Sequence, residues 1–93
     1  MKMDEKDTAK IFKALSDEKR LSILKILKNG EICACHLLED LTLTQSGLSY
    51  HMKILTDAGL VNGREVGKWI HYSLNKEGVD SALSFLESIR EGM

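Results

Sequence analysis

Proline is absent from this sequence of 93 residues, and so is any apolar run near the ~18 residues that a membrane-spanning helix requires. The first seven residues, 1–7, lack the apolar core of a signal peptide, so we expect a cytoplasmic protein with no membrane partner. Cysteine is scarce: only Cys33 and Cys35 are present, and we expect both thiols to be reduced in that compartment. These absences argue against a membrane protein and against a secreted scaffold held together by disulfides.

The rest of the composition is that of an ordinary globular chain. Hydrophobic residues make up 43% and charged residues 29% of the sequence, and the length fits one small domain, residues 1–93. The formal net charge of −1 hides a local excess of positive charge. Residues 41–76 hold four Lys or Arg side chains and two acidic ones, together with His51 and His71. Phosphate binding requires a local basic patch rather than a basic total, so this charge is compatible with a nucleic-acid partner.

Hydrophobic spacing and capping residues predict four helices before residue 60. The first covers residues 7–15, and Ser16 is the expected N-cap of a second helix that ends at Gly30. A third helix is expected at residues 34–41 and a fourth at 45–57, with three residues between them. Two helices joined by so short a turn are typical of a helix-turn-helix.

Beyond the fourth helix the apolar period changes from that of a helix to that of a strand. Two strands, residues 60–65 and 69–74, are expected to form a hairpin around a glycine-containing link at 66–68. A last helix near residues 79–90 is expected to bury the apolar side chains of Val79, Leu83, Leu86 and Ile89. The predicted fold is mainly α with one small β-hairpin, in the order helix, helix, helix-turn-helix, wing, helix. This is a winged helix.

The exposed face of the fourth helix carries side chains suited to DNA. Amide and hydroxyl groups suit base edges and an ammonium suits phosphate, and the candidates on this face are Gln45, Ser46, Ser49, Tyr50 and Lys53. Any solvated helix face can carry these residue types, but here they follow a three-residue turn and precede a basic hairpin. On the hairpin, Arg64 and Lys68 flank Gly67 and are the expected phosphate contacts, although cations also protect exposed strand edges. Trp69 and Tyr72 are expected to anchor the core.

Cys33 and Cys35 lie at the expected start of the third helix. Residues two apart point about 200° apart on a helix, so a fully helical pair cannot hold one ion, whereas in an extended segment both side chains share a face. The helix N-terminus would also lower the thiol pKa and favour a soft ion. His36 could add a nitrogen ligand or be a plain surface histidine. Two inert cysteines that act as small apolar residues are the alternative interpretation of the pair.

Four stretches of the chain form a wider pattern. They are Glu-Ile-Cys-Ala-Cys-His-Leu from residue 31, Leu-Thr-Gln-Ser-Gly-Leu-Ser-Tyr-His-Met-Lys-Ile-Leu from residue 43, Ala-Gly-Leu-Val from residue 58 and Gly-Lys-Trp-Ile-His-Tyr-Ser-Leu from residue 67. Over about residues 8–90 the chain resembles the ArsR/SmtB family of metal-sensing repressors, above all its arsenical-responsive branch. The resemblance implies a homodimeric winged helix that releases operator DNA when As(III) or Sb(III) binds the thiols of Cys33 and Cys35. It also places in the recognition helix Gln45, Ser46, Ser49, Tyr50 and His51.

The chain departs from the family pattern at several positions. Many arsenic sensors have a third cysteine where this chain has Leu38, and the Asp of the motif is His36 here. No cysteine precedes Cys33 and no histidine follows Ser73, so the cadmium, lead and zinc sites of relatives are not matched. A two-thiolate arsenic site remains, with His36, hydroxide or a small cellular thiol as its open third ligand.

We therefore expect a homodimeric repressor of double-stranded operator DNA with no permanent cofactor, whose first and last helices form the dimer interface. Two alternatives keep the winged helix: the cysteine pair as a thiol redox switch, or inert cysteines in a module that contacts proteins. An enzyme is not expected, because the sequence has no pair of general acid and base groups, no Gly-rich phosphate loop and no Cys-x-x-Cys.

Overall fold

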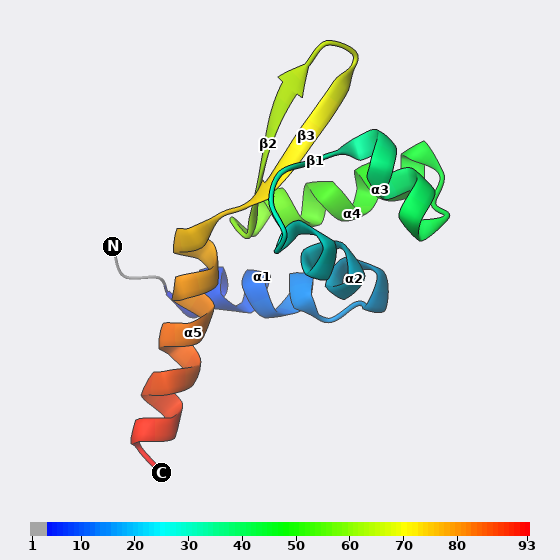
Figure 1. Ribbon diagram of the computed structural model, residues 1–93. Coiled ribbons are helices and arrows are strands. Elements are labelled where there is room, and N and C mark those ends of the chain that lie inside the picture. The colour runs from blue at the N-terminus through cyan, green and yellow to red at the C-terminus, as the bar shows by residue number, and fades with distance from the viewer. Residues whose placement is uncertain (1–3) are drawn as a thin grey trace.

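The computed structural model describes residues 4–93 as a helical body from which a hairpin and a helix project in opposite directions (Figure 1). The body contains α1 (Glu5–Leu15), α2 (Glu18–Leu27), β1 (Ile32–Cys33), α3 (Ala34–Leu41) and α4 (Gln45–Asp57). The projections are the hairpin of β2 (Val61–Val66) and β3 (Trp69–Leu74), and α5 (Lys76–Glu91). Residues 1–3 lie outside the described residues. They begin both the expected domain and the segment in which no signal peptide is expected. Within residues 4–93 no helix is long and apolar enough to cross a membrane.

Polar side chains cap the helices and set where each one begins. Thr44 accepts the N–H of Gly47 at 3.0 Å, so α4 begins at the expected residue, 45. Asn75 accepts the N–H of Gly78 at 2.9 Å, so α5 begins three residues before the expected start. The prediction for α2 was wrong, because Asp17 and not Ser16 is its N-cap. The hydroxyl of Ser16 instead donates to a carbonyl at the end of α1.

The expected helix-turn-helix is confirmed, with α3 and α4 separated by three residues. The hairpin is also confirmed, although β2 begins and ends one residue later than expected. An unexpected third strand, β1, pairs antiparallel with β3 and places Cys33 opposite His71. A two-residue strand shows no periodicity of its own, so only its partner across the sheet reveals it.

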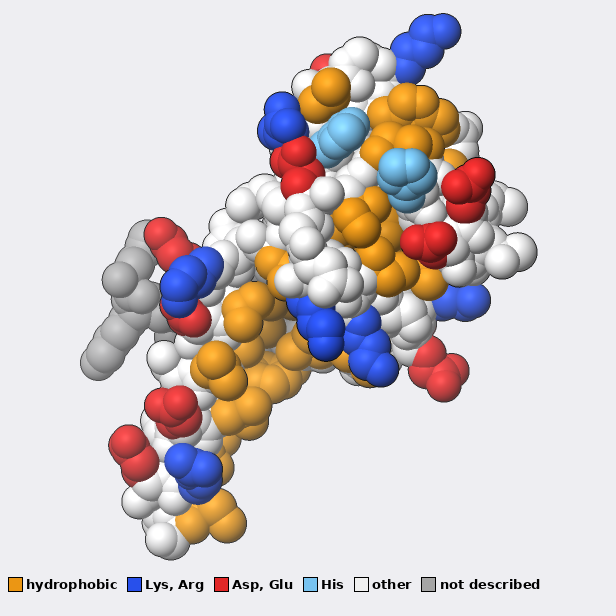
Figure 2. Space-filling model, in the orientation of Figure 1, with side chains coloured by type: hydrophobic (Ala, Val, Ile, Leu, Met, Phe, Trp, Pro, Cys, Tyr) orange, Lys and Arg blue, Asp and Glu red, His pale blue; other side chains and the backbone are white. Residues whose placement is uncertain are grey.

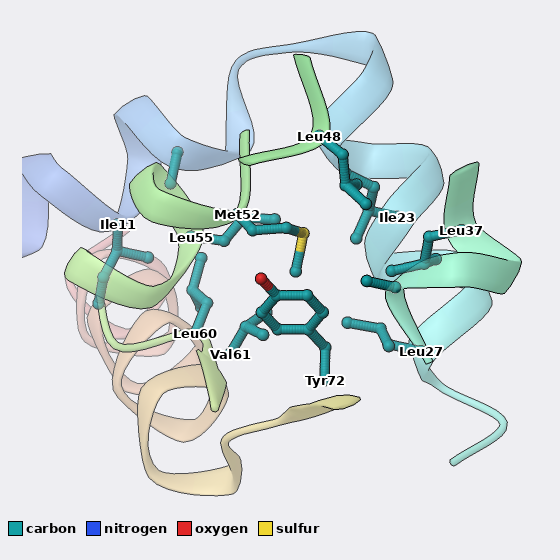
Figure 3. Packing of buried hydrophobic residues seen from close by; sticks show 12 residues of the cluster. Ile11, Ile23, Leu27, Leu37, Leu48, Met52, Leu55, Leu60, Val61 and Tyr72 are labelled. Carbon is teal, nitrogen blue, oxygen red and sulfur yellow. The ribbon is translucent and has the colours of Figure 1, made fainter. Parts of the chain in front are cut away.

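The core lies where α1 to α4 meet the base of the hairpin (Figure 3). Tyr72 points from β3 into this cluster and is 8% exposed, as expected of an anchor, and its burial raises the pKa of the phenol. Trp69 was expected to be a second anchor, but it is 37% exposed beside the hairpin turn. The largest fully buried side chains are Ile11, Ile23, Leu27, Leu37, Met52 and Leu55.

α5 packs on the body at its first turn and, farther along, through one aromatic side chain. A Cβ at Gly78 would collide with the carbonyl oxygen of Gly59, so this close approach requires glycine. Farther along, Phe85 contacts Phe12 of α1, with ring centroids 5.6 Å apart. The apolar side chains that were expected to be buried on this helix are not buried inside the single chain, where they form an exposed band along it (Figure 2). Its members, the α5 band, are Val79, Leu83, Phe85, Leu86 and Ile89.

Candidate functional site

The outer face of α4 is open to solvent along its length. Leu48, Met52 and Leu55 fix the helix on the core, which turns the opposite side chains outward. Tyr50 is 63% exposed and the side chain of Lys53 is 78% exposed. The candidate residues that share this exposed face, the α4 face, are Gln45, Ser46, Ser49, Tyr50 and Lys53.

A hollow of about 280 Å³ joins the α4 face to the hairpin. Gln45 and Ser49 line it from α4, Lys68 lines it from the hairpin turn, and Trp69 lines it from the start of β3. Gly67 adopts a φ of 63° in this turn, a left-handed conformation that glycine permits without steric cost, and so allows the chain to reverse. The structure thus brings polar side chains of the helix and a cation of the wing around one concave surface.

Arg64 lies on β2 rather than at the hairpin tip, and its guanidinium is already paired. Its Nε donates to Oε2 of Glu31 at 2.8 Å, and its Nη2 donates to Oε1 at 2.7 Å. This bidentate pair lowers the pKa of the Glu31 carboxyl and raises the pKa of Arg64. Arg64 therefore differs from Lys68, although the sequence suggested the same role for both.

His51 does not belong to the α4 face. Its side chain is only 13% exposed and turns toward α2, where Nη1 of Arg20 lies 3.1 Å from its Nδ1. Oδ2 of Asp17 lies 3.9 Å from the same nitrogen. The family resemblance placed His51 in the recognition helix. His51 does lie on that helix, α4, but its side chain faces inward and not toward a ligand bound on the exposed face.

Two lysines of α1 adjoin the α4 face and were not singled out from the sequence. Lys10 and Lys13 line a hollow of about 260 Å³ together with Tyr50. Both lysines are exposed, while Ile11 and Ala14 beside them are buried. Their spacing of three residues on the polar side of an amphipathic helix is the signal that could have identified them.

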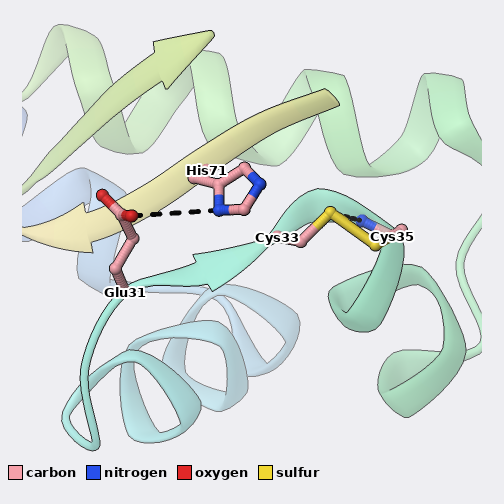
Figure 4. Close-up of a disulfide and its surroundings, with 4 residues drawn as sticks. All are labelled: Glu31, Cys33, Cys35 and His71. Carbon is pink, nitrogen blue, oxygen red and sulfur yellow. Dashed lines mark hydrogen bonds and ion pairs between the residues drawn. A yellow bond between two sulfur atoms is a disulfide. The ribbon is translucent and has the colours of Figure 1, made fainter. Parts of the chain in front are cut away.

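The two sulfur atoms of the cysteine pair are joined as a disulfide at the start of α3 (Figure 4). Cys33 has extended backbone angles, φ −66° and ψ 140°, whereas Cys35 lies in the first turn of the helix. Because the pair straddles this boundary, both side chains point to one place, and the N–H of Cys35 also donates to Sγ of Cys33 at 3.2 Å. The structure confirms the expected position of the pair, across the start of this helix.

Within the described residues, no third ligand is grouped with the two cysteines. His36 is exposed on α3, and residues 4–93 contain no group of three or more His, Cys, Asp or Glu side chains that could hold a metal ion. His71 lies opposite Cys33 in the sheet, but its Nδ1 faces Oε1 of Glu31 at 3.8 Å (Figure 4). The proposed nitrogen ligand is thus not assembled with the two sulfurs.

Comparison with known proteins agrees with this geometry. Residues 17–63 match the family described as bacterial regulatory protein, arsR family. The arsenical resistance operon repressor of Bacillus subtilis is 49% identical over 78% of this chain and 70% of its own length. That of Staphylococcus aureus is 44% identical over 94% of this chain and 84% of its own. The solved structure of HlyU from Vibrio cholerae is 31% identical, with a TM-score of 0.76 over 96% of this chain and 97% of that one. The chain belongs to the arsR family of bacterial regulatory proteins, with the winged-helix DNA-binding fold of a transcriptional repressor.

Proposed function

We propose that this repressor binds its operator as a homodimer and releases it when As(III) or Sb(III) binds the thiolates of Cys33 and Cys35. The observation that carries the proposal is the meeting of both sulfurs at the N-terminus of α3, the helix that packs on α4. The names of the two similar repressors, both of arsenical resistance operons, support the choice of ion.

On the DNA side, the α4 face supplies the contacts to base edges and Lys68 supplies a phosphate contact from the wing. Lys53 pairs with Asp57 at 3.2 Å, but both side chains are largely exposed. Such a pair contributes little, so a phosphate can compete for the ammonium. Arg64 can join only if its guanidinium leaves Glu31.

On the ion side, both cysteines must first be reduced, because a disulfide has no thiolate to offer. Binding then releases protons, since each sulfur coordinates in its deprotonated form. The third position around the ion is filled from solution, by hydroxide or a small cellular thiol, and His36 stays outside the site.

Two short elements can carry the signal to DNA. Cys35 lies in the first turn of α3, the helix that packs on α4, and Cys33 belongs to β1, which pairs with β3 of the wing. Drawing both reduced sulfurs onto one ion changes this junction, and with it the relation of the α4 face to the wing. The effect requires a differential affinity of ~1–3 kcal/mol between the two forms, which corresponds to roughly 5–150-fold.

The test is operator dissociation against As(III) for the reduced protein and for Cys33→Ser, Cys35→Ser and the double variant. Each serine variant should bind operator like the natural chain, because neither residue lies on the α4 face. Each should lose release by As(III), because one thiolate cannot chelate. His36→Ala is the matched control and should release at the same As(III) concentration. Normal release by the double variant would remove the cysteines from the mechanism.

The closeness of the two sulfurs also suits a second candidate, in which oxidation replaces the ion. Two thiols lose two protons and two electrons to a peroxide, which is reduced to water as the disulfide forms. In metal-free buffer, peroxide would then release operator from the natural chain but not from either serine variant. Release by As(III) alone, with peroxide inactive, would reject this candidate.

A further inference from the structure

One charged side chain in the described part of the chain is buried, and it connects the recognition helix to two others. Arg20 of α2 is 8% exposed. Its Nε donates to the carbonyl of Ala14 at 2.8 Å and its Nη2 to the carbonyl of Lys13 at 3.4 Å, both in the last turn of α1. Its Nη1 lies 3.1 Å from Nδ1 of His51, in the middle of α4.

A buried guanidinium with partners on two further helices constrains their relative orientation. Hydrogen bonds from a charged donor are among the stronger ones, and a buried donor without a partner is costly. We propose that Arg20 is a positioning residue for DNA recognition, which acts through His51 to set the angle at which α4 presents its exposed face. The inference rests on DNA binding by this family fold and is independent of the ion.

The contact also defines the proton state of His51. Arginine has no acceptor, so Nδ1 must offer its lone pair and the ring proton sits on Nε2. The charged and titratable groups around this contact are Asp17, Arg20, Tyr50, Asp57, Lys10 and Lys13. Through this acceptor, Arg20 links the middle of α4 to the last turn of α1.

Two substitutions of His51 test the inference. His51→Gln keeps an uncharged acceptor oxygen, whereas His51→Leu removes the acceptor. The leucine variant should lose about tenfold in operator affinity with unchanged affinity for nonspecific DNA, because base readout depends on the angle of α4 and phosphate binding does so less. The glutamine variant should recover most of the loss. Arg20→Lys, which cannot reach three partners, should behave like the leucine variant, and thermal midpoints should report folded proteins throughout.

Recovery by His51→Gln is the readout that a purely structural role of the ring would not give, because glutamine restores the acceptor and not the shape of the imidazole. No recovery in His51→Gln, full operator affinity in His51→Leu, or an equal loss on operator and nonspecific DNA would each overturn the inference. Absence of operator binding by the natural chain would instead contradict the proposed function.

Discussion

At the scale of single residues, the two cations of the hairpin are no longer equivalent. Lys68 stands in the turn with its ammonium free to approach a phosphate, beside the hollow that it shares with Gln45. Arg64 is held by two short hydrogen bonds to Glu31. A phosphate that recruits Arg64 must first replace a bidentate carboxylate, so its net gain is small.

The salt dependence of operator binding should separate these residues. Removing the side chain that binds one phosphate should flatten the slope of log affinity against log salt by about 0.9. Lys53→Ala and Lys68→Ala should each show this change, and Arg64→Ala should keep nearly the full slope. The slope is measured by fluorescence anisotropy of labelled operator at several salt concentrations. An equal change for Arg64→Ala would show that this guanidinium leaves Glu31 in the complex.

At the scale of elements, the segment before α3 and the wing are held together by charge as well as by strand pairing. Glu31 precedes β1, contacts Arg64 of β2 and lies 3.8 Å from His71 of β3. The Arg64 guanidinium holds the pKa of the Glu31 carboxyl below its ordinary value of 4.5. The folded state therefore gains stability from ionised Glu31 above pH 4.5 and loses it as pH falls through the lower folded pKa.

Thermal melts between about pH 7 and about pH 3 should show the contribution of ionised Glu31 to the stability of the folded state. Glu31→Gln lacks the carboxylate, so it should be less stable than the natural chain near neutrality, and the difference should shrink as the pH falls below 4.5. Glu65→Gln is the matched control, because Glu65 lies on the same strand as Arg64 and forms no ion pair within residues 4–93. A difference that stays constant with pH would show that Glu31 acts through packing alone.

At the scale of the whole molecule, the α5 band is an apolar surface that the other residues of 4–93 leave exposed. Leu83 and Leu86 are 52% and 51% exposed, and α1 lies alongside through the contact of Phe12 with Phe85. A second copy related by two-fold symmetry would bury the same band on both protomers. To read two half-sites on one side of DNA, the two α4 faces of such a dimer must lie about 34–36 Å apart, the spacing of successive major grooves.

Sedimentation at micromolar concentration should find a dimer for the natural chain. Leu83→Glu with Leu86→Glu should give a folded monomer, because charges in the α5 band oppose its burial, and operator affinity should fall with the loss of the second half-site. Leu21→Glu is the matched control, since this side chain is 47% exposed on α2 and away from the band, and it should remain dimeric. A natural chain that sediments as a monomer, even with operator present, would reject the homodimer.

The sequence alone determined the elements whose causes are local. The bounds of α3 and α4 follow from apolar spacing and from Thr44 as an N-cap, and β3 follows from alternation between two turns. The placement of Cys33 and Cys35 across a helix start is local in the same sense. Capping and periodicity act within four residues, so neighbouring side chains are sufficient to predict them.

The tertiary structure decided what depends on partners far away in the sequence. Arg64 meets Glu31 across 33 residues, which pairs a candidate DNA contact that stays exposed. Arg20 meets His51 across 31 residues, which turns the second candidate inward. The strand at Cys33 exists because β3 lies beside it. In α5 the helical period was interpreted correctly, but periodicity shows only that one face is apolar. Whether that face meets its own core or solvent depends on where the rest of the chain lies, and here most of the helix extends beyond the core.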